Sequence, residues 1–346
     1  MPSKNIPRIS VVIIAFNHGK YISECIESIV NQTLSPFEII IVDDCSTDNT
    51  REIAKMWQNK CPNKINLIKN SVNIGPGLTA IKEMKSIKGE LISWLDGDDY
   101  WLPNKLQAEW NALKKNTKAK IAYSNVFIVN SKSETQFVWY EERDHCLPSG
   151  DVLVQVLSRQ FFPNNHSIFR NFLIYNSSLR EVGYRDSSLR SYWDWDWKIR
   201  LTSRFRVCYS GEASVAYRKH TDGMSMKNPE LHLKAMHEIY NKHKTLIDSR
   251  SLSEQIKIRL NIEFLIHKQK KSLGLLDHDR YYTGYNIFKR NYKLLCKLKY
   301  HDYLSVRKDD FMIFLSLIIP GFFLNVIRNT YKFVDKIKRR LINTYV

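Results

Sequence analysis

The segment Leu91-Ile92-Ser93-Trp94-Leu95-Asp96-Gly97-Asp98-Asp99 decides the fold of this chain. An apolar strand runs directly into three carboxylates, and packing does not explain this because clustered carboxylates repel each other and resist desolvation. A divalent cation would compensate them. Asp96 and Asp98 are two residues apart and can point the same way in extended backbone, so their oxygens suit Mg²⁺ or Mn²⁺ that also carries substrate phosphates. The alternative is an acidic turn that caps the next helix, with Asp99 capping before Pro103.

Strand and helix patterns alternate upstream of this segment. The β-branched apolar run over 9–16 predicts a central parallel strand, and it stops at Asn17-His18-Gly19. Further patterns predict helices over 21–32 and 49–60 and strands over 37–42 and 65–68. This order implies an α/β fold with a doubly wound, mostly parallel central sheet, in which the carboxyl ends of the strands form the ligand crevice. Asn17, Asp44 and Asp96 all lie at such ends.

Two common nucleotide-binding motifs are excluded. Gly75-Pro76-Gly77-Leu78-Thr79-Ala80 matches the spacing of the dinucleotide fingerprint, but it follows the third strand, and the fingerprint has meaning only in the first βα turn. The sequence also contains no G-x-x-x-x-G-K-[ST] loop, so an ATPase of the P-loop type is excluded.

Four short segments occur in an order and spacing that together are specific: Ser10–Asn17, Glu38–Thr50, Asn73–Gly75 and Leu95–Asp99. They resemble the inverting glycosyltransferases of family 2, which have the GT-A fold. The resemblance covers roughly residues 8 to 226. It implies transfer of a sugar from a nucleotide-diphosphate donor with the help of Mn²⁺ or Mg²⁺.

The resemblance also implies roles for single residues. In this family the first strand end and the Asp-Asp-x-Ser loop hold the nucleotide base and ribose, and the D-x-D motif holds the metal and the diphosphate. The positions that inherit donor binding are Ala15, Phe16, Asn17, Asp44, Asn73, Gly75, Asp96 and Gly97, and Asp96 and Asp98 inherit the metal site. The chain departs from the family pattern at Ile14, which replaces a proline, and at Thr79-Ala80-Ile81, which replaces an Ala-Arg-Asn tripeptide whose arginine helps to hold the base. The second departure leaves the identity of the base open.

Asp194 is the predicted general base. The segment Ser191–Leu201 aligns with the family's Glu-Asp-Tyr-Asp-x-x-Leu-Arg-Leu segment and puts Asp194 on the catalytic aspartate, while Trp193 replaces the glutamate before it. An acceptor hydroxyl that attacks the anomeric carbon needs a carboxylate within reach to take its proton. Between aromatic rings, we expect Asp194 to be partly desolvated and its basicity to be raised. The alternative base is Asp196, although it can also pair with Arg200 four residues later.

His220 is a third predicted metal ligand. It lies in Tyr217–Ser225, which matches a family segment whose histidine approaches the metal or the diphosphate. A lone histidine is more often structural, but this one stands between a basic pair and a glycine loop at the end of the catalytic region.

The last third of the chain differs in composition. The net charge of the 346-residue chain is +18, and from Glu230 onward we count 23 Lys and Arg against 11 Asp and Glu. Apolar residues recur there at helical spacing without strand signals. We therefore expect two domains, a nucleotide-sugar-binding catalytic domain over 1–228 and a basic, helical C-terminal region over 229–346.

The stretch 311–327 is uncharged and is followed by a basic cluster. At about 1.5 Å per residue it reaches roughly 25 Å, short of the roughly 30 Å hydrocarbon core, so we expect it to lie at an anionic membrane surface rather than to span it. The alternative is a helix pair packed on the catalytic domain. No nucleic-acid motif accompanies the charge, so nucleic acid is not expected as a partner.

The six cysteines show neither C-x-x-C pairs nor metal spacing, which indicates reduced thiols in the cytoplasm. No signal peptide is recognised at the amino terminus. The sequence thus predicts an inverting, metal-dependent glycosyltransferase at the inner face of the cell membrane. It would transfer sugar from a nucleotide-diphosphate sugar, a UDP-sugar, to a glycan or polyprenyl-linked acceptor in surface-polysaccharide synthesis. The rival prediction is a non-catalytic nucleotide-sugar- or membrane-binding protein with the same fold. The transferred sugar, the linkage and the acceptor stay open.

Overall fold

A computed structural model describes residues 6–83, 87–140, 147–159, 169–189, 191–220 and 229–273. The chain divides into two compact units, Met1–Lys227 and Asn228–Val346. The strands of the first unit are β1 Ile9–Ala15, β2 Glu38–Asp43, β3 Ile65–Lys69, β4 Leu91–Asp96, β5 Tyr100–Trp101, β6 Ala119–Val129, β7 Thr135–Val138, β8 Leu173–Tyr175 and β9 Arg206–Arg218. Its helices are α1 Ile22–Val30, α2 Thr50–Lys60, α3 Gly75–Glu83, α4 Lys105–Lys115, α5 Leu153–Ser158, α6 Asn176–Val182 and α7 Trp193–Thr202.

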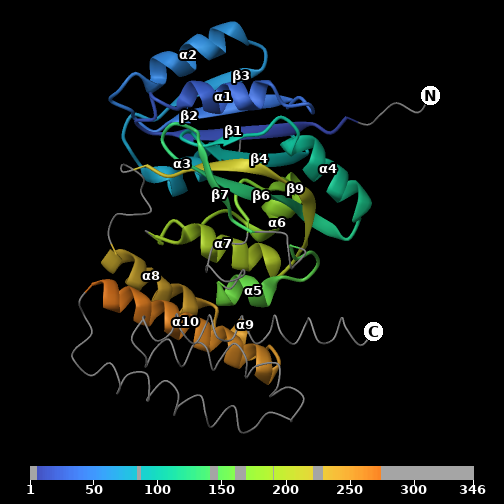
Figure 1. Ribbon diagram of the computed structural model, residues 1–346, viewed down its shortest axis with the longest axis vertical. Coiled ribbons are helices and arrows are strands. Elements are labelled where there is room, and N and C mark those ends of the chain that lie inside the picture. Colours follow the sequence, from blue (N-terminus) through green and yellow to red (C-terminus); the bar gives the residue numbers. More distant parts are fainter. Residues whose placement is uncertain are drawn as a thin grey trace, which may run out of the picture. The chain divides into compact units, whose positions relative to one another are not determined.

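One mixed sheet forms the centre of the first unit (Figure 1). Its strand order is β3-β2-β1-β4-β8-β6-β9-β5, and β7 pairs with β6. The block β3-β2-β1-β4 is parallel, as is the pair β6–β9, whereas β8 and β5 pair in the antiparallel sense. The α/β fold with a mostly parallel sheet is therefore confirmed.

The register of the sheet places the predicted site residues side by side. Ala15 of β1 is paired with Asp43 of β2, and Ile14 is paired with Asp96 of β4. All seven residues of β1 are buried, as expected for a central strand covered on both faces. The loops that follow β1, β2 and β4 consequently leave the sheet at the same edge.

A buried ion pair ties α4 to the centre of the sheet. Lys105 Nζ lies 2.9 Å from Glu109 Oε2, and both side chains are fully buried. Lys105 Nζ also donates to Ser93 Oγ at 2.7 Å and to the carbonyl oxygen of Asn171. Burial lowers the pKa of Lys105 and raises the pKa of Glu109 to about 7. Because Lys105 holds the main chain at Asn171, it fixes the place where Arg170 enters the site.

Asp99 does not cap the helix that follows it. That helix, α4, begins at Lys105 with Asn104 at its N-cap position. Asp99 lies five residues earlier, only 1% exposed, and it accepts a hydrogen bond from the backbone N–H of Arg218. The capping alternative is therefore wrong, because β5 intervenes between the acidic loop and the helix.

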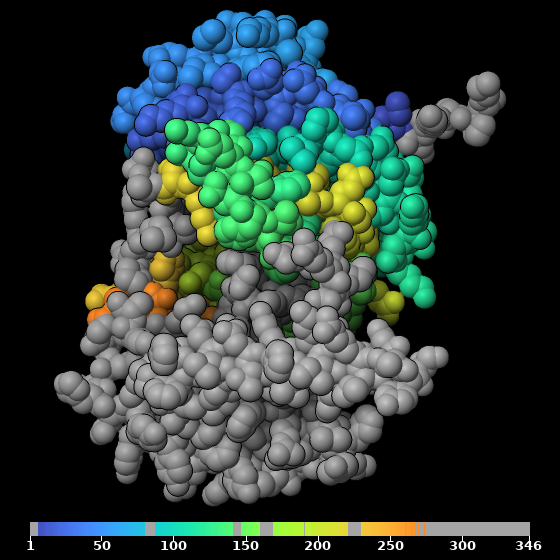
Figure 2. Space-filling view, viewed as in Figure 1, coloured from blue at the N-terminus to red at the C-terminus, as the bar shows by residue number. Residues whose placement is uncertain are grey.

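The described part of the second unit is helical: α8 Pro229–Lys242, α9 Lys244–Asp248 and α10 Leu252–Ser272. The stretch 311–327 lies outside the described residues. Among the helices that the structure does describe, none is both long and apolar enough to cross a membrane. In the space-filling view, α1 and α2 of the first unit appear in blue, and its segment of β6 and β7 lies on the near face in green (Figure 2).

Candidate functional site

The ends of β1 and β2 are joined through Asn17. Its side-chain Oδ1 accepts a hydrogen bond of 2.8 Å from the backbone N–H of Thr47, and its own N–H donates to Ser46 Oγ at 3.0 Å. Asn17 has a φ of +56°, in the left-handed region that asparagine tolerates better than most residues. Ala15 is fully buried, whereas the neighbouring Phe16 ring is 40% exposed at the strand end. Phe16 thus presents a flat apolar face beside an ordered polar loop.

Asp44 organises the start of α3. It is 1% exposed, and its carboxylate accepts three hydrogen bonds, from Asn70 Nδ2 at 2.8 Å and from the backbone N–H groups of Ile74 at 3.1 Å and Gly75 at 2.7 Å. Gly75 also donates to Asn73 Oδ1 at 3.1 Å and has a φ of +83°, which favours glycine. One hydrogen-bond network therefore contains three of the predicted donor-binding residues, Asp44, Asn73 and Gly75. Within it, Asp44 holds the backbone of the loop that leads into α3.

Gly97 allows His18 to approach the acidic loop. A Cβ atom at Gly97 would lie 2.7 Å from His18 Nδ1 and 3.1 Å from the Cβ of Ala15. No larger residue fits there without displacing β1 or the imidazole. The glycine of the Asp-Gly-Asp motif is thus explained by close packing.

Asp98 and His220 are brought together, as the sequence predicts. His220 Nε2 lies 3.0 Å from Asp98 Oδ2, and the His220 ring packs 5.2 Å from the ring of Tyr21. His18 Nε2 lies 3.8 Å from the same carboxylate oxygen. The side chain of Asp98 is 17% exposed and that of His220 is 8% exposed. Two imidazoles, one near the start and one near the end of the sequence of the first unit, therefore converge on one carboxylate.

Asp96 makes a different contact. Its Oδ2 lies 3.0 Å from Arg170 Nη2, and the same guanidinium lies 3.5 Å from Asp99 Oδ2. Arg170 also stacks over the ring of Tyr217 with its Cζ 3.9 Å from the centroid. Although burial acts in the opposite direction, Asp99 and Asp96 raise the pKa of Arg170. Burial and the neighbouring Asp98 raise the pKa of Asp99 well above its ordinary value. Asp96 is therefore partly neutralised by an arginine that the sequence did not reveal.

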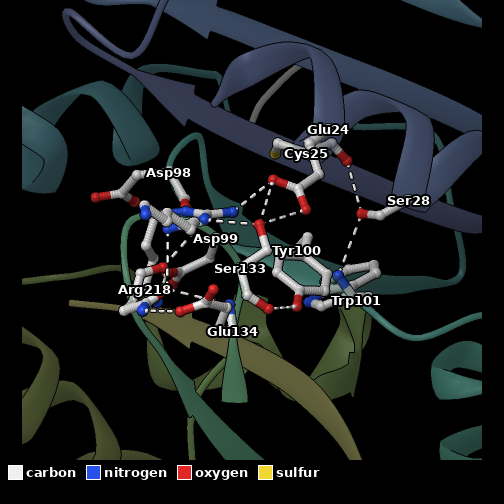
Figure 3. Close-up of polar contacts among 12 residues, drawn as sticks. Glu24, Cys25, Ser28, Asp98, Asp99, Tyr100, Trp101, Ser133, Glu134 and Arg218 are labelled. Atoms are coloured by element: carbon white, nitrogen blue, oxygen red, sulfur yellow. Dashed lines mark hydrogen bonds and ion pairs between the residues drawn. The ribbon is translucent and has the colours of Figure 1, made fainter. Parts of the chain in front are cut away.

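Arg218 fixes the main chain of the acidic loop (Figure 3). Its side chain is 1% exposed, and its Nε donates to the carbonyl oxygen of Asp98 at 2.8 Å. Its Nη2 pairs with Glu24 Oε2 at 2.5 Å, and its Nη1 donates to Ser133 Oγ at 2.9 Å. Since the backbone N–H of Arg218 also binds Asp99, this one residue ties β9, α1 and the turn before β7 to the loop after β4.

The residues around Asp98 fit a metal ion that is completed by its substrate. Among the described residues, no group of three or more His, Cys, Asp or Glu side chains is arranged to hold an ion by itself. Mg²⁺ and similar ions, however, are commonly bound by one or two carboxylates together with phosphates and water. Asp98 supplies a carboxylate and His220 an imidazole, and the Nδ1 atom of His220 is buried without a hydrogen-bond partner in the described part of the chain.

Asp194 lies in the first turn of α7, with a side chain 39% exposed. Its Oδ2 accepts a hydrogen bond of 3.1 Å from Lys198 Nζ. Burial alone would raise the pKa of Asp194, but Lys198, Arg159 and Arg170 together lower it to about 2. The prediction that aromatic neighbours raise its basicity is therefore wrong, because three cations outweigh desolvation.

Asp196 has a structural environment. It is fully buried, and its Oδ2 accepts a 3.0 Å hydrogen bond from Arg200 Nε, whose other nitrogen atoms donate to the carbonyl oxygens of Val182 and Tyr184. A carboxylate in that position cannot meet a hydroxyl arriving from solvent.

Three tryptophans in and beside the first turn of α7 differ in exposure. Trp195 and Trp197 are both buried, with Trp197 5.2 Å from the ring of Trp94. Trp193 and Trp197 are four residues apart on the helix, yet only Trp193 keeps part of its surface exposed. Trp193 is half-buried and lies 3.4 Å from where a Cβ of Gly77 would stand.

Sequence reasoning missed several basic residues and one histidine of this site: His18, Arg159, Arg170, Arg185 and Arg218. His18 and Arg218 carried a usable signal, because each lies within two residues of a predicted site residue in a motif. Arg159 and Arg170 come from segments without any recognised pattern. Only the sheet topology, which inserts β8 between β4 and β6, brings Arg170 to Asp96.

Comparison with known proteins agrees with this geometry. The model of the family "Glycosyl transferase family 2" matches residues 10–176. An uncharacterized glycosyltransferase of Rickettsia typhi is 28% identical over 217 residues, 62% of this chain and 64% of that protein. A poly(ribitol-phosphate) beta-glucosyltransferase of Bacillus spizizenii is 34% identical over 137 residues, 39% of this chain and 21% of that protein. The chain thus spans less than two thirds of the length of both relatives.

A solved structure shares the fold. Residues 1–349 of S. aureus TarS, in complex with UDP-GlcNAc, superpose with a TM-score of 0.56 at 18% identity, covering 90% of this chain and 84% of that one. This likeness supports the GT-A type of α/β fold.

Proposed function

We propose, because the chain belongs to glycosyl transferase family 2, that it transfers a sugar with inversion from a UDP-sugar to a hydroxyl group of a glycan or lipid-linked oligosaccharide in cell-surface polysaccharide synthesis. The observation that carries this proposal is the Asp98–His220 pair, 3.0 Å apart where β4 ends. In doubly wound sheets, ligands bind at the carboxyl ends of the strands. The named activity of the Bacillus spizizenii relative supports sugar transfer to a polymer. The UDP-GlcNAc bound to TarS supports a UDP-sugar as the donor.

The nucleotide would lie over the loops after β1 and β2. The exposed ring of Phe16 offers a stacking face for the base, and Asn17 holds the adjoining loop in place. Asp44 would act through the Asn73–Gly75 turn that it anchors. Ala15 and Gly97 pack closely together and would set the spacing of the ends of β1 and β4, beside which the diphosphate would lie.

Asp98 and His220 would hold Mn²⁺ or Mg²⁺, with Asp96 as a further ligand once it exchanges Arg170 for the cation. Such an ion supplies positive charge that stabilises the departing diphosphate. Arg170 would then keep its contact with Asp99, 3.5 Å away, and stay beside the site as an additional positive charge.

Asp194 would take the proton of the acceptor. Its low pKa keeps it ionised at neutral pH, and its exposed position allows a hydroxyl to reach it. The acceptor oxygen forms a bond to the anomeric carbon while its proton is transferred to the carboxylate of Asp194. The bond from the anomeric carbon to the diphosphate oxygen breaks at the same time, and the diphosphate leaves with the electron pair.

The basic C-terminal region would place the enzyme at the cytoplasmic face of the membrane. This part of the proposal rests on the sequence, since 311–327 and the basic cluster after it lie outside the described residues. Attraction worth about 1 kcal/mol per basic residue predicts binding to anionic vesicles that weakens with salt. Removal of 311–346 should abolish vesicle binding and leave UDP binding unchanged. The membrane proposal would be contradicted if the full-length protein bound only neutral vesicles, or if it bound no anionic vesicles at low salt.

A panel of nucleotide-sugars tests the proposed function. Each is added to the full-length protein with Mn²⁺, and the melting temperature is measured. One UDP-sugar should stabilise the protein strongly in the presence of Mn²⁺ and weakly in its absence. Stabilisation without any turnover of that sugar, even with water as the acceptor, would favour the non-catalytic rival, and stabilisation by none of them would contradict the proposal.

A further inference from the structure

Basic side chains surround the Asp194 carboxylate. Lys198 Nζ lies 3.1 Å from it. Arg159 stacks on the ring of Tyr192, and Arg185 stacks on the ring of Trp193. Both rings lie at the start of α7, the helix that carries Asp194. Arg170 reaches the same region from the Asp96 side. The proposed base therefore stands in a strongly positive environment.

Two of these cations have carboxylate partners and two do not. Lys198 pairs with Asp194, and Arg170 pairs with Asp96 at 3.0 Å. Neither Arg159 nor Arg185 forms an ion pair within the described ranges. The Nη1 atom of Arg159 and the Nε atom of Arg185 are buried without a hydrogen-bond partner there. Unpaired buried donors of this kind cost free energy unless a ligand satisfies them.

The two arginines are nevertheless held in fixed places. Arg159 Cζ lies 4.3 Å from the ring centroid of Tyr192 and 5.1 Å from that of Trp195. Arg185 Cζ lies 3.8 Å from the centroid of Trp193, and its Nη1 donates to the carbonyl oxygen of Pro76 at 3.3 Å. Stacking on aromatic faces orients a guanidinium and leaves its edge available for an anion.

The rings that hold the two arginines lie on different sides of α7. Side chains of a helix are about 100° apart per residue, so Trp193 and Trp195 point in nearly opposite directions. Asp194 lies between them in this arrangement. Arg185 on the Trp193 side and Arg159 on the Trp195 side therefore flank the proposed base.

We infer that the acceptor is a polyanionic chain, whose phosphodiester or carboxylate groups bind Arg159 and Arg185 while its hydroxyl group meets Asp194. This inference rests on the proposed function, because it assigns the acceptor side of the same site. A neutral glycan would leave the charge of both guanidinium groups without an anionic partner. Anionic groups on either side of the reacting hydroxyl would satisfy both, since arginine suits bidentate binding of phosphate and carboxylate. The donor diphosphate, placed at Asp98, does not account for Arg159, which stacks on Tyr192 and Trp195.

The test uses the full-length protein saturated with UDP and Mn²⁺, so that the donor site is filled. Isothermal titration then measures the binding of three probes: a synthetic glycerol phosphate hexamer, hexagalacturonate and neutral maltohexaose. At least one anionic hexamer should bind, with affinity that falls as NaCl is raised, and maltohexaose should not. The tighter of the two anions identifies the acidic group. Failure of both anionic hexamers to bind the UDP-saturated protein would overturn the inference while leaving UDP binding, and thus the proposed function, intact.

Variants assign the binding to the two arginines. Arg159→Gln and Arg185→Gln should each weaken binding of the anionic hexamer about tenfold or more, as expected for a hydrogen bond to a charged group, and leave the Kd for UDP unchanged. The matched control is Arg204→Gln, since Arg204 is 67% exposed and lies 4.0 Å from Glu181. Melting curves check that each variant is folded, and Arg159→Lys, which keeps the charge, should recover part of the affinity. Loss of UDP binding in Arg185→Gln would assign that arginine to the donor and contradict the inference, as would equal binding by all variants.

Discussion

The Nε atom of Arg218 donates a 2.8 Å hydrogen bond to the backbone carbonyl of Asp98, the residue whose side chain meets His220. Arg218 and His220 are two residues apart at the end of β9, so one strand end fixes the loop and also supplies its imidazole partner. Arg218 consequently sets the geometry of the Asp98–His220 pair through the main chain of Asp98, without a hydrogen bond to the carboxylate or the imidazole of the pair.

Arg218→Lys should lower stability and activity together. Lysine keeps one charge but cannot reach Glu24, Ser133 and the Asp98 carbonyl at once, because it lacks the planar fork. We expect a loss of roughly 2 to 4 kcal/mol in the free energy of unfolding, measured in urea. The control is Arg206→Lys at the exposed start of β9. An unchanged midpoint for Arg218→Lys would mean that the network is not needed.

Asp98→Asn should preserve the fold and remove metal-dependent donor binding. The amide is nearly isosteric, but it takes away the charged ligand beside His220. Isothermal titration with UDP should show an affinity that depends on Mn²⁺ for the wild type and not for the variant. Glu52→Gln, at an exposed site on α2, is the matched control. Near-wild-type UDP binding with Mn²⁺ in Asp98→Asn would show that the metal lies elsewhere.

The sequence allowed much of the first half of the sheet to be predicted. The apolar runs that form β1, β2 and β4 are buried on both faces. The polar residues after them lie at the carboxyl ends of parallel strands, where such sheets bind their ligands. The error at Asp194 has two sources. Lys198, four residues later, was visible in the sequence as a helical pair, whereas Arg159 and Arg170 reach Asp194 only through tertiary structure. Local neighbours alone therefore gave the wrong sign for its pKa shift.

Substitution of Asp194 should affect the rate of transfer, whereas substitution of Asp196 should affect the stability of the fold. Asp194→Asn should leave UDP affinity nearly unchanged and reduce transfer by about 10² or more, the usual scale for loss of a general base. Asp196→Asn should instead destabilise the protein by about 3 kcal/mol, because it leaves Arg200 without its buried partner. Urea unfolding and turnover of both variants separate these effects. If Asp196→Asn were stable but inactive while Asp194→Asn kept its activity, the roles would be exchanged.

Asp194 should stay ionised through the physiological range. Its folded pKa of about 2 lies below the unfolded value, so its contribution to stability is present above about pH 4 and is lost as the pH falls toward 2. Aspartate-selective ¹³C NMR should show that the carboxyl resonance missing from Asp194→Asn titrates below pH 3. A midpoint above pH 5 would mean that Lys198 and the arginines do not act on it as the structure indicates.

The anomeric form of the released sugar tests the central claim most directly. With the UDP-sugar that best stabilises the protein, and with water as the only acceptor, proton NMR follows the sugar released before mutarotation. An inverting enzyme should convert the α-linked donor first into the β-anomer, only with Mn²⁺ present, and about 10² or more times slower in Asp194→Asn. Release of the α-anomer first, or release that is equally fast in Asp194→Asn, would contradict inversion with Asp194 as the base.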